Sequence, residues 1–494
     1  MDRRPSQGGL IPPSSFVFHP SPASRRGVIL VLVLWLLLIV SLIGLSYSSS
    51  VRTGVTITGY RANKVKARYY ARAGIERTIA ELLLREDGFY SESEITGFYD
   101  DVELFAQQPI GRGFFSLVTG RKNEAGEPIY GITDEASRLN LNEVTEEALL
   151  TFPEITEEMI DSLLDWRDED WDQNIEGAED DYYAMLEDPY LCKNANLQTV
   201  TELLLVRGWT TVELFGEDAN NNGLLDRNEN DADESPPDDD ADGELDFGLV
   251  SFFTIYSRDK EMNPEGETRL DLNSATEEQL QQIEGIDQTQ ARSIVAWRGQ
   301  NRFDSLADLF DVTEAQQQSQ QQGSQRGSAQ QPGTRSSRGS SGSSSQERSG
   351  SSSQSGQQGS SASSRQPRRV FDYDQVAQIV DWLCISTEDK ANRINVNTAP
   401  FEVLMTLPEM TEELATEIIT RRESSLGPFT LRLELRDVNG MTEEIFRGLL
   451  DYVTVQSYLF RIIAEGYEGE TQAVIEAVID VGDETPKILY WRES

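Results

Sequence analysis

Residues 24–50 read SRRGVILVLVLWLLLIVSLIGLSYSSS, and this stretch decides how the chain is organised. The run 28–47 contains no charged residue, and its 20 residues are enough to cross the ~30 Å hydrocarbon core of a bilayer as a helix. A cleaved secretory signal has a shorter apolar core and a small-residue cleavage site, which fits this stretch poorly. Basic residues precede the run, so we expect a cytoplasmic N-terminal segment and an outward-facing body: Arg3, Arg4, Arg25 and Arg26.

The helical pattern continues beyond the apolar run. Residues 60–87 read YRANKVKARYYARAGIERTIAELLLRED and contain no proline. Their apolar residues recur at steps of three and four and so share one face of a helix: Ala67, Tyr70, Ala71, Gly74, Ile75, Ile79 and Leu82 or Leu83. We therefore predict one helix from about 28 to about 85, roughly 85 Å long, that starts in a membrane and packs against a globular head.

The composition argues against catalysis and against nucleic acid as a general partner. The net charge is −42, from 85 acidic and 43 basic residues, and such a surface repels phosphate. The one histidine, His19, precedes the apolar run, so the body lacks Ser-His-Asp, Cys-His and histidine-ligated zinc sites. No phosphate-binding loop of the Walker type is present. We expect no enzyme. Cys192 and Cys384 allow one disulfide, and the sequence leaves open whether it forms.

The body contains one unit three times. The copies begin RLNLNEVTEEALLTFPEITEEMIDSLLDWRDED at Arg138, RLDLNSATEEQLQQIEGIDQTQARSIVAWRGQ at Arg269 and RINVNTAPFEVLMTLPEMTEELATEIITRRES at Arg393. Each copy starts with a strand-like segment and predicts a helix, a tight turn and a second helix, followed by a third element. An asparagine, or the Thr or Ser after it, is expected to cap the first helix: Asn142, Asn273 and Asn397.

This unit resembles the helix-hairpin-helix, which in DNA-binding proteins contacts phosphate through backbone N–H groups of a Gly-containing hairpin. Here only the second hairpin keeps a glycine, Gly285, and all three carry acids: Glu154, Glu157, Glu158, Glu284, Asp287, Glu409, Glu412 and Glu413. Carboxylates repel phosphate, so we expect the hairpins to pack against protein and not to bind DNA.

An acidic loop, 217–249, separates the first two copies. It carries 13 acids and one base up to Asp246, which is typical of a solvated loop, but it also matches the D-x-N-x-N-G-x5-E pattern of an EF-hand. The predicted calcium ligands are Asp218, Asn220, Asn222, the Leu224 carbonyl, Asp226 and Glu229, with Gly223 at the turn. A second, partial pattern lacks the last carboxylate because Leu249 takes its place: Asp238, Asp240, Asp242 and Asp246.

A basic leader ending in glycine, an apolar helix and an amphipathic continuation resemble type IV pilins and type II secretion pseudopilins. The resemblance implies that a prepilin peptidase cuts after Gly27 and that Val28 becomes a methylated N-terminus. Most pilins carry a glutamate five residues into the mature chain, and here that position is Leu32. The minor pseudopilin K family typically lacks this glutamate. The segments WRDEDWDQNIEGAEDDYYAMLEDPY and ILYWRES also resemble that family.

The resemblance implies a subunit at the tip of a type II secretion pseudopilus that helps start and cap the filament for protein export. It implies a single pass through the inner membrane at 28–47 and a periplasmic body. Its partners would be the other minor pseudopilins, the prepilin peptidase, the inner-membrane assembly platform and membrane lipid, with no nucleic acid. Two alternatives remain: an envelope-anchored DNA-uptake receptor built on the hairpins, and a calcium-dependent adhesin at a type IV pilus tip.

Together these patterns predict an α+β fold: a long N-terminal helix on a pilin-like antiparallel sheet, interrupted by a large helical insertion of helix-hairpin-helix-like units. Three C-terminal strands are expected at about 459–465, 472–480 and 487–492. The predicted divisions are a leader at 1–27, the helix at 28–86, the first part of the head at 87–137, the insertion at 138–313, a disordered Ser/Gln/Gly linker at 314–369, the third unit at 370–457 and the rest of the head at 458–494.

Overall fold

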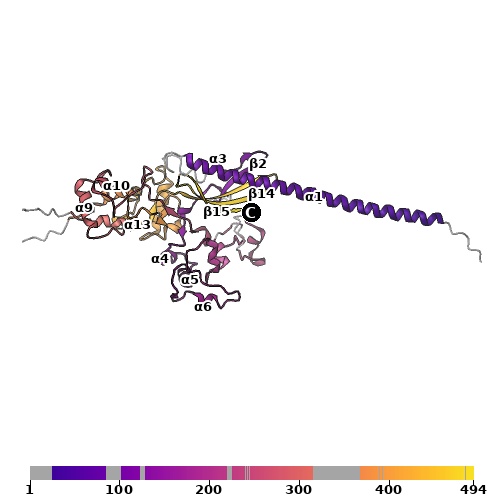
Figure 1. Ribbon diagram of the computed structural model, residues 1–494, viewed down its shortest axis with the longest axis horizontal. Coiled ribbons are helices and arrows are strands. Elements are labelled where there is room, and N and C mark those ends of the chain that lie inside the picture. The colour runs from indigo at the N-terminus through magenta and orange to yellow at the C-terminus, as the bar shows by residue number, and fades with distance from the viewer. Residues whose placement is uncertain are drawn as a thin grey trace, which may run out of the picture.

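The structure is a computed structural model that combines one projecting helix, one sheet and a helical body (Figure 1). It describes residues 25–84, 102–122, 128–219, 225–239, 241, 243, 245–246, 248–314, 368–388, 390–391, 393–483 and 485–493. The expected linker, apart from residues 314, 368 and 369, and much of the acidic loop lie outside the described residues.

Helix α1, Arg25–Leu84, is a single helix of 60 residues, as the sequence predicts. Its residues 29–62 are all exposed, and this part projects from the body (Figure 1). The apolar face of its second half packs on the sheet, where Ala67 and Ala71 are fully buried and Ile75 is 1% exposed. Ala67 and Ala71 have small side chains, so the helix backbone can lie close to the sheet. This close contact fixes the position of the helix on the head.

The sheet is antiparallel, and its main strands follow the order β1-β2-β13-β14-β15. The pairs join strands from both ends of the sequence, since β2 pairs with β13 and β4 pairs with the start of β13. The chain therefore leaves the sheet after β4 and returns to it at β13, with the helical body between them. The bounds are β1 Gln108–Ile110, β2 Gly113–Lys122, β3 Pro128–Tyr130, β4 Thr133–Asp134, β13 Leu459–Glu468, β14 Thr471–Asp480 and β15 Lys487–Glu493, with the short helix α3 at Val102–Phe105.

Strand β13 lies under α1 because its side chains alternate. Phe460, Ile462 and Ala464 are buried, and the residues between them are only partly buried. At Gly466 a Cβ atom would lie 1.9 Å from the carbonyl oxygen of Ala67, so only glycine fits beneath the helix. The predicted α+β fold, with the helix on an antiparallel sheet and three C-terminal strands, is confirmed.

The helical body consists of three units that share one order of elements. Each opens with a two-residue strand, continues with a helix of 4 residues and a helix of 11 residues, and then has a 3-10 helix of 6 residues and a last helix. A second two-residue strand closes each unit by pairing in parallel with the first. This strand pair joins the start of each unit to its end.

The elements of the units and their connections are bounded as follows. The first unit has β5 Leu139–Asn140, α4 Glu146–Leu149, α5 Glu157–Arg167, α6 Asp180–Tyr183, η2 Val200–Leu205, α7 Thr211–Phe215, η3 Arg227–Glu229, η4 Ala232–Glu234, η5 Leu249–Ser251 and β6 Phe253–Thr254. The second has β8 Leu270–Asp271, α8 Glu277–Leu280, α9 Gln288–Arg298, η6 Leu306–Asp311, α10 Tyr373–Ile379, η7 Val380–Trp382 and β9 Leu383–Cys384. The third has β11 Ile394–Asn395, α11 Phe401–Leu404, α12 Glu412–Arg422, η8 Arg432–Asp437, α13 Glu443–Leu449 and β12 Val453–Thr454. Outside them lie η1 Glu135–Ser137 and a pair of β7 Arg258–Asp259 with β10 Lys390–Ala391.

The second unit extends further than the sequence indicates. The boundary predicted from the sequence, at 370, places α10 and β9 in the third unit. In the structure β9 pairs with β8 of the second unit. The chain also leaves and re-enters the second unit at one place, because Thr313 forms a β-bridge with Arg369. The second unit therefore closes at Cys384, and the third begins near Arg393, where its repeat begins in the sequence.

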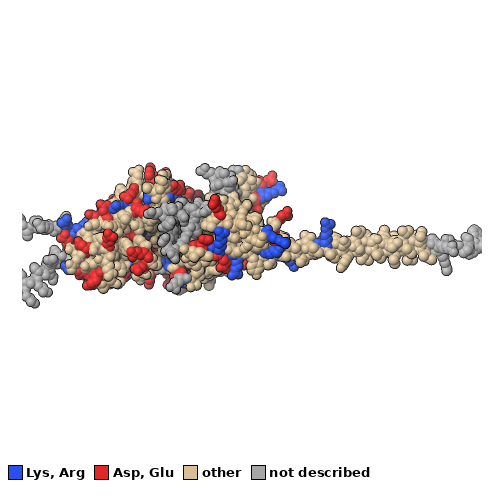
Figure 2. All heavy atoms as spheres, turned by 90° about the horizontal axis from the view of Figure 1, so that it is seen from above, with Lys and Arg blue, Asp and Glu red and all other residues tan. Residues whose placement is uncertain are grey.

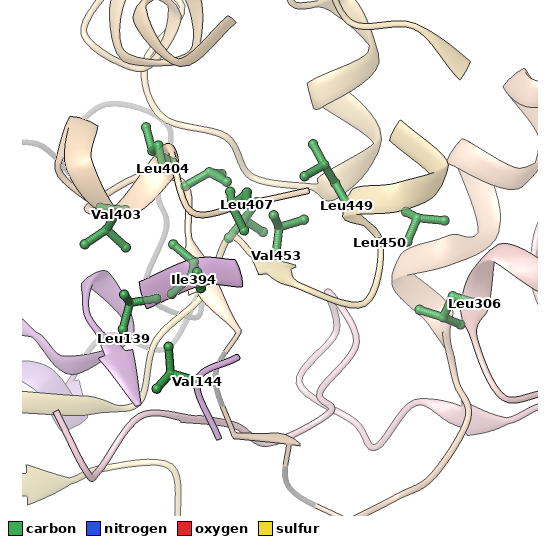
Figure 3. Packing of buried hydrophobic residues seen from close by; sticks show 14 of the residues in the cluster. Leu139, Val144, Leu306, Ile394, Val403, Leu404, Leu407, Leu449, Leu450 and Val453 are labelled. Atoms are coloured by element: carbon green, nitrogen blue, oxygen red, sulfur yellow. The ribbon is translucent and has the colours of Figure 1, made fainter. Parts of the chain in front are cut away.

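The three units share one hydrophobic core. In Figure 3, Leu139 of the first unit lies beside Ile394 of the third. The head has a separate core between α1 and the sheet. Burial of these apolar side chains stabilises both parts, at about 25 cal/mol for each Å² removed from water.

The contact of α1 with the sheet can be tested at Gly466. In Gly466→Ala the new Cβ meets a backbone carbonyl that cannot rotate away, so we expect a loss of about 1–3 kcal/mol in unfolding free energy. Thermal unfolding of the detergent-solubilised chain measures it. Gly299→Ala is the matched control, because its nearest atom lies 3.4 Å away in its own helix. Equal stability of both variants would contradict the close approach.

Candidate functional site

The projecting part of α1 is a candidate membrane anchor. The segment Ile29–Leu84 contains an 18-residue window with a mean hydropathy of 3.0, none of it buried inside the protein. Figure 2 shows few charged atoms along this part of the helix. Leu32 is 62% exposed, so no contact within the chain accounts for an apolar residue there. Gly27 and Val28 lie in the first turn of α1, and cleavage between them stays a prediction.

Basic residues gather where α1 meets the head (Figure 2). The Lys66 Nζ atom lies 2.7 Å from Glu468 Oε1, and the Tyr70 hydroxyl donates to Glu468 Oε2 at 3.0 Å. The Lys66 hydrogen bond lowers the pKa of Glu468. Arg68 forms an ion pair with Glu493 at 3.0 Å. These pairs join the helix to the ends of β13 and β15, just beyond the apolar segment.

The repeated asparagines hold the units together and do not cap helices. Asn397 donates to the Phe429 carbonyl at 2.8 Å and accepts from the Phe429 N–H at 2.8 Å. Asn142 and Asn273 make the same two bonds with Leu197 and Phe303. The residues at the N-caps of the first helices are Thr145, Thr276 and Pro400. The expectation that the asparagine caps the helix is therefore wrong, and the alternative, the Thr after it, holds for two units.

An arginine at the end of each 11-residue helix reaches back to the start of its own unit. Arg422 Nη1 donates to the carbonyls of Val396 at 2.9 Å and Ala399 at 2.7 Å. Arg298 donates in the same way to Leu272 and Ala275, and Arg167 to Leu141 and Val144. These carbonyls lie between the first strand and the first helix of each unit, and the guanidinium group supplies N–H donors to them there.

The hairpin tips offer no phosphate cradle. The side chains of Thr156, Asp287 and Thr411 accept hydrogen bonds from the third N–H of the helix that follows. The first turns of the helices after Thr156 and Thr411 also carry two glutamates each. Because the N–H groups are partly occupied and the charge is negative, this geometry argues against the DNA-receptor alternative.

A buried ionic cluster joins the second and third units, and sequence reasoning missed it. Arg269 Nη1 lies 2.7 Å from Glu261 Oε2, while Arg393 lies 2.8 Å from Asp259 Oδ2 and 2.7 Å from Glu261 Oε1. All four side chains are at most 4% exposed. Burial would raise the pKa of Asp259, but Arg269 and Arg393 outweigh it and hold that pKa below its usual value. The signal in the sequence was the arginine that opens each repeat.

A second buried contact joins the head to the third unit at Asp134. Its Oδ2 atom accepts hydrogen bonds from Asn395 Nδ2 at 2.8 Å and from Thr398 Oγ1 at 2.6 Å. Its Oδ1 atom accepts from the Ala136 N–H at 2.7 Å and from the Ser457 hydroxyl. Burial raises the pKa of Asp134 despite these donors. The carboxyl group thus fixes both chain crossings between head and body.

Only part of the predicted calcium site lies within the described residues of the acidic loop. Asp218 and Glu229 are buried, and the Asp226 N–H donates to Glu229 Oε2 at 2.8 Å. Burial raises the pKa of Glu229, and the nearby charges of Asp218 and Asp226 raise it further. Asn220, Asn222, Gly223 and Leu224 lie outside the described residues, as do Asp240 and Asp242. Asp238 is exposed, and the Asp246 N–H donates to Glu217 at 3.1 Å.

Among the residues that the structure describes, no group of three or more His, Cys, Asp or Glu side chains is arranged to hold a metal ion. The two cysteines are free. Burial raises the pKa of both Cys192 and Cys384 to about 12, so neither thiol is reactive near neutral pH.

The family model for type II secretion system (T2SS), protein K, matches residues 136–214, which run from η1 to α7 of the first unit. A helix-hairpin-helix model matches 265–322 and 389–454, in the second and third units. The family resemblance inferred from the sequence is thereby confirmed.

The solved structures add a distant likeness. A chain in the crystal structure of the GspK-GspI-GspJ complex from the enterotoxigenic Escherichia coli type 2 secretion system is 12% identical, with a TM-score of 0.37. The match covers 88% of this chain and 99% of that chain. No curated protein matches this chain.

The buried ionic cluster can be tested at Arg393. Arg393→Met leaves Asp259 and Glu261 with one arginine in place of two, so we expect a loss of about 3–5 kcal/mol in unfolding free energy. Denaturant titration measures it. Arg292→Met is the matched control, because Arg292 is 48% exposed beside Glu277 and should cost less than ~1 kcal/mol. Adding Glu261→Gln to Arg393→Met should recover part of the loss, and no recovery would argue against an uncompensated charge.

Proposed function

We propose that this chain is a minor pseudopilin at the tip of a type II secretion pseudopilus, where it helps start and cap the filament. The observation that carries the proposal is the position of the body. In Figure 1 helices α9, α10 and α13 lie beyond the end of the sheet opposite to the projecting part of α1, and α4 to α6 lie beside the sheet. A subunit stacked above the head would meet this body. The protein K match supports the same role, which is assembly and not catalysis.

The apolar part of α1 anchors the chain in the inner membrane, and the acidic body lies in the periplasm. The four N-terminal arginines keep the leader cytoplasmic. The partners are the other minor pseudopilins, of the kind found with GspK as GspI and GspJ, together with the inner-membrane assembly platform. Leu32 fits the first subunit of a filament, because a carboxylate among lipid tails is costly unless it meets a cation and no subunit above supplies one.

The capping role can be tested by removing the body. Residues 138–456 can be replaced by a short Gly-Ser linker, because β4 pairs with β13 and the retained Ser457 hydroxyl bonds to Asp134. We expect the shortened chain to keep its head and its partners but no longer to stop subunits from stacking above it. Filaments seen by electron microscopy should then be longer than with the full chain. Equal filament length with both chains would contradict capping.

The prepilin peptidase is expected to cut between Gly27 and Val28. Mass spectrometry of the purified chain, made with and without the peptidase, measures the mature N-terminus. The expected product starts at a methylated Val28. A chain that keeps Arg25 to Gly27 in the presence of the peptidase would show an ordinary membrane anchor.

We propose further that calcium binds the acidic loop through the oxygen atoms of Asp218, Asn220, Asn222, Leu224, Asp226 and Glu229. The support is the EF-hand spacing, together with the burial of Asp218 and Glu229, because a buried carboxylate is stabilised by a cation. The set Asp238, Asp240, Asp242 and Asp246 is a second, weaker candidate. The cation would stabilise the loop and take no part in chemistry.

Removal of calcium tests this site. A ligand present at 100 times its Kd stabilises the folded state by about 2.7 kcal/mol, so a chelator should lower the melting temperature by several degrees. Glu229→Gln should abolish the difference between calcium and chelator. Identical melting curves of the unaltered chain in both conditions would contradict calcium binding.

A further inference from the structure

A cleft of about 870 Å³ lies where the three helical units meet. The first unit contributes Glu143 and Thr145, and the second contributes Asp304, Ser305 and Ala307. The rest of the lining comes mainly from the hairpin and last helix of the third unit, including Pro408, Glu409, Glu444, Asp451 and Tyr452. A volume of this size falls in the range of ligand sites, roughly 300–1,000 Å³.

The charge of the cleft is negative. Five acids line it, and two of its three basic residues are already paired: Arg393 in the buried ionic cluster and Arg447 with Asp311. Within the described part of the chain, Asp304, Glu409 and Glu444 take part in no ion pair. Asp451 accepts hydrogen bonds from the Ser305 hydroxyl and the Leu306 N–H. Together with Glu143, these three acidic side chains remain to face whatever enters the cleft.

Glu409 is held in a strained backbone conformation at the edge of this cleft. Its φ is +57°, in the left-handed region that favours glycine. The corresponding residue of the second hairpin is Gly285, with a φ of +98°. Glycine would fit the third hairpin without strain, yet the position carries a carboxylate that lines the cleft. Strain of this kind is kept where a side chain has a use.

The remaining lining suits the body of a long basic side chain. Tyr452 is 43% exposed, and Pro408 and Ile385 are further apolar residues of the lining. An ammonium or guanidinium group binds carboxylates and the face of a tyrosine, while its aliphatic stem covers apolar surface. We propose that this cleft binds a segment of a partner protein that carries lysine or arginine between apolar residues.

The test uses fluorescence anisotropy with a labelled, end-capped Lys-Leu-Lys-Leu-Lys peptide and the detergent-solubilised full chain. The salt concentration is kept near 0.15 M, because the whole protein is acidic and weak surface binding is screened there. We expect saturable binding that weakens with added salt. A peptide with glutamate in place of lysine should not bind.

The deciding variant is Glu409→Gly. It removes the carboxylate and the strain together, so the melting temperature should rise while affinity for the peptide falls about tenfold. Glu154→Gly is the matched control, since it removes the corresponding hairpin acid of the first unit, which does not line the cleft. Its affinity should equal that of the unaltered chain. Unchanged affinity in Glu409→Gly, or an equal loss in both variants, would overturn the proposal.

A second arm separates a protein segment from a small polyamine. Spermine carries the same positive groups without the apolar side chains. We expect it to compete with the peptide only weakly, because Tyr452, Pro408 and Ile385 contribute to binding of the leucines. Competition by spermine at the same concentration as the unlabelled peptide would overturn the assignment to a protein segment.

Discussion

The helical body depends on one constraint: two buried arginines and two buried carboxylates must stay together between the second and third units. Asp259 and Glu261 lie in the connection that follows the first unit, while Arg269 and Arg393 open the next two. Separated, each charge would be left in the interior at a cost of several kcal/mol. The cluster therefore fixes where both units start. A further buried pair, Arg432 with Asp381 at 2.8 Å, joins the same two units at another point.

The constraint extends to the head through neighbouring residues. Lys260, next to Asp259, lies 2.8 Å from Asp483 and 3.4 Å from Asp480, at the end of β14. On the other side, Asp134 of the head receives hydrogen bonds from Asn395 and Thr398, close to Arg393. The body is thus held to the sheet by polar groups on both sides. An insertion of this size can be carried by a small sheet because its crossings are fixed at both ends.

Local patterns in the sequence predicted the long helix, the C-terminal strands and the threefold repeat. The helix came from an unbroken apolar run and a continuing 3.6-residue period, and the strands from alternation, which is still seen at Phe460, Ile462 and Ala464. What could not be predicted are contacts between residues far apart. The hydrogen bonds of Asp134 span 261 and 264 residues, and the partner of β9 lies before a long low-complexity segment. A strand of two residues is too short to show an alternating pattern. The sequence of 370–384 therefore does not mark this segment as the end of the second unit.

The two candidate sites differ in the same way, because one follows a local sequence pattern and the other depends on residues far apart in the sequence. The EF-hand spacing is a local pattern that can be read from the sequence alone, and calcium binding there stays a prediction. The cleft has no local pattern, because its acids come from three units more than 100 residues apart. Glu409 gave one usable sign, since it stands where Gly285 stands in the second copy. A hairpin that could receive phosphate on a glycine turn has a carboxylate there instead, which turns the same scaffold from binding anions to binding cations.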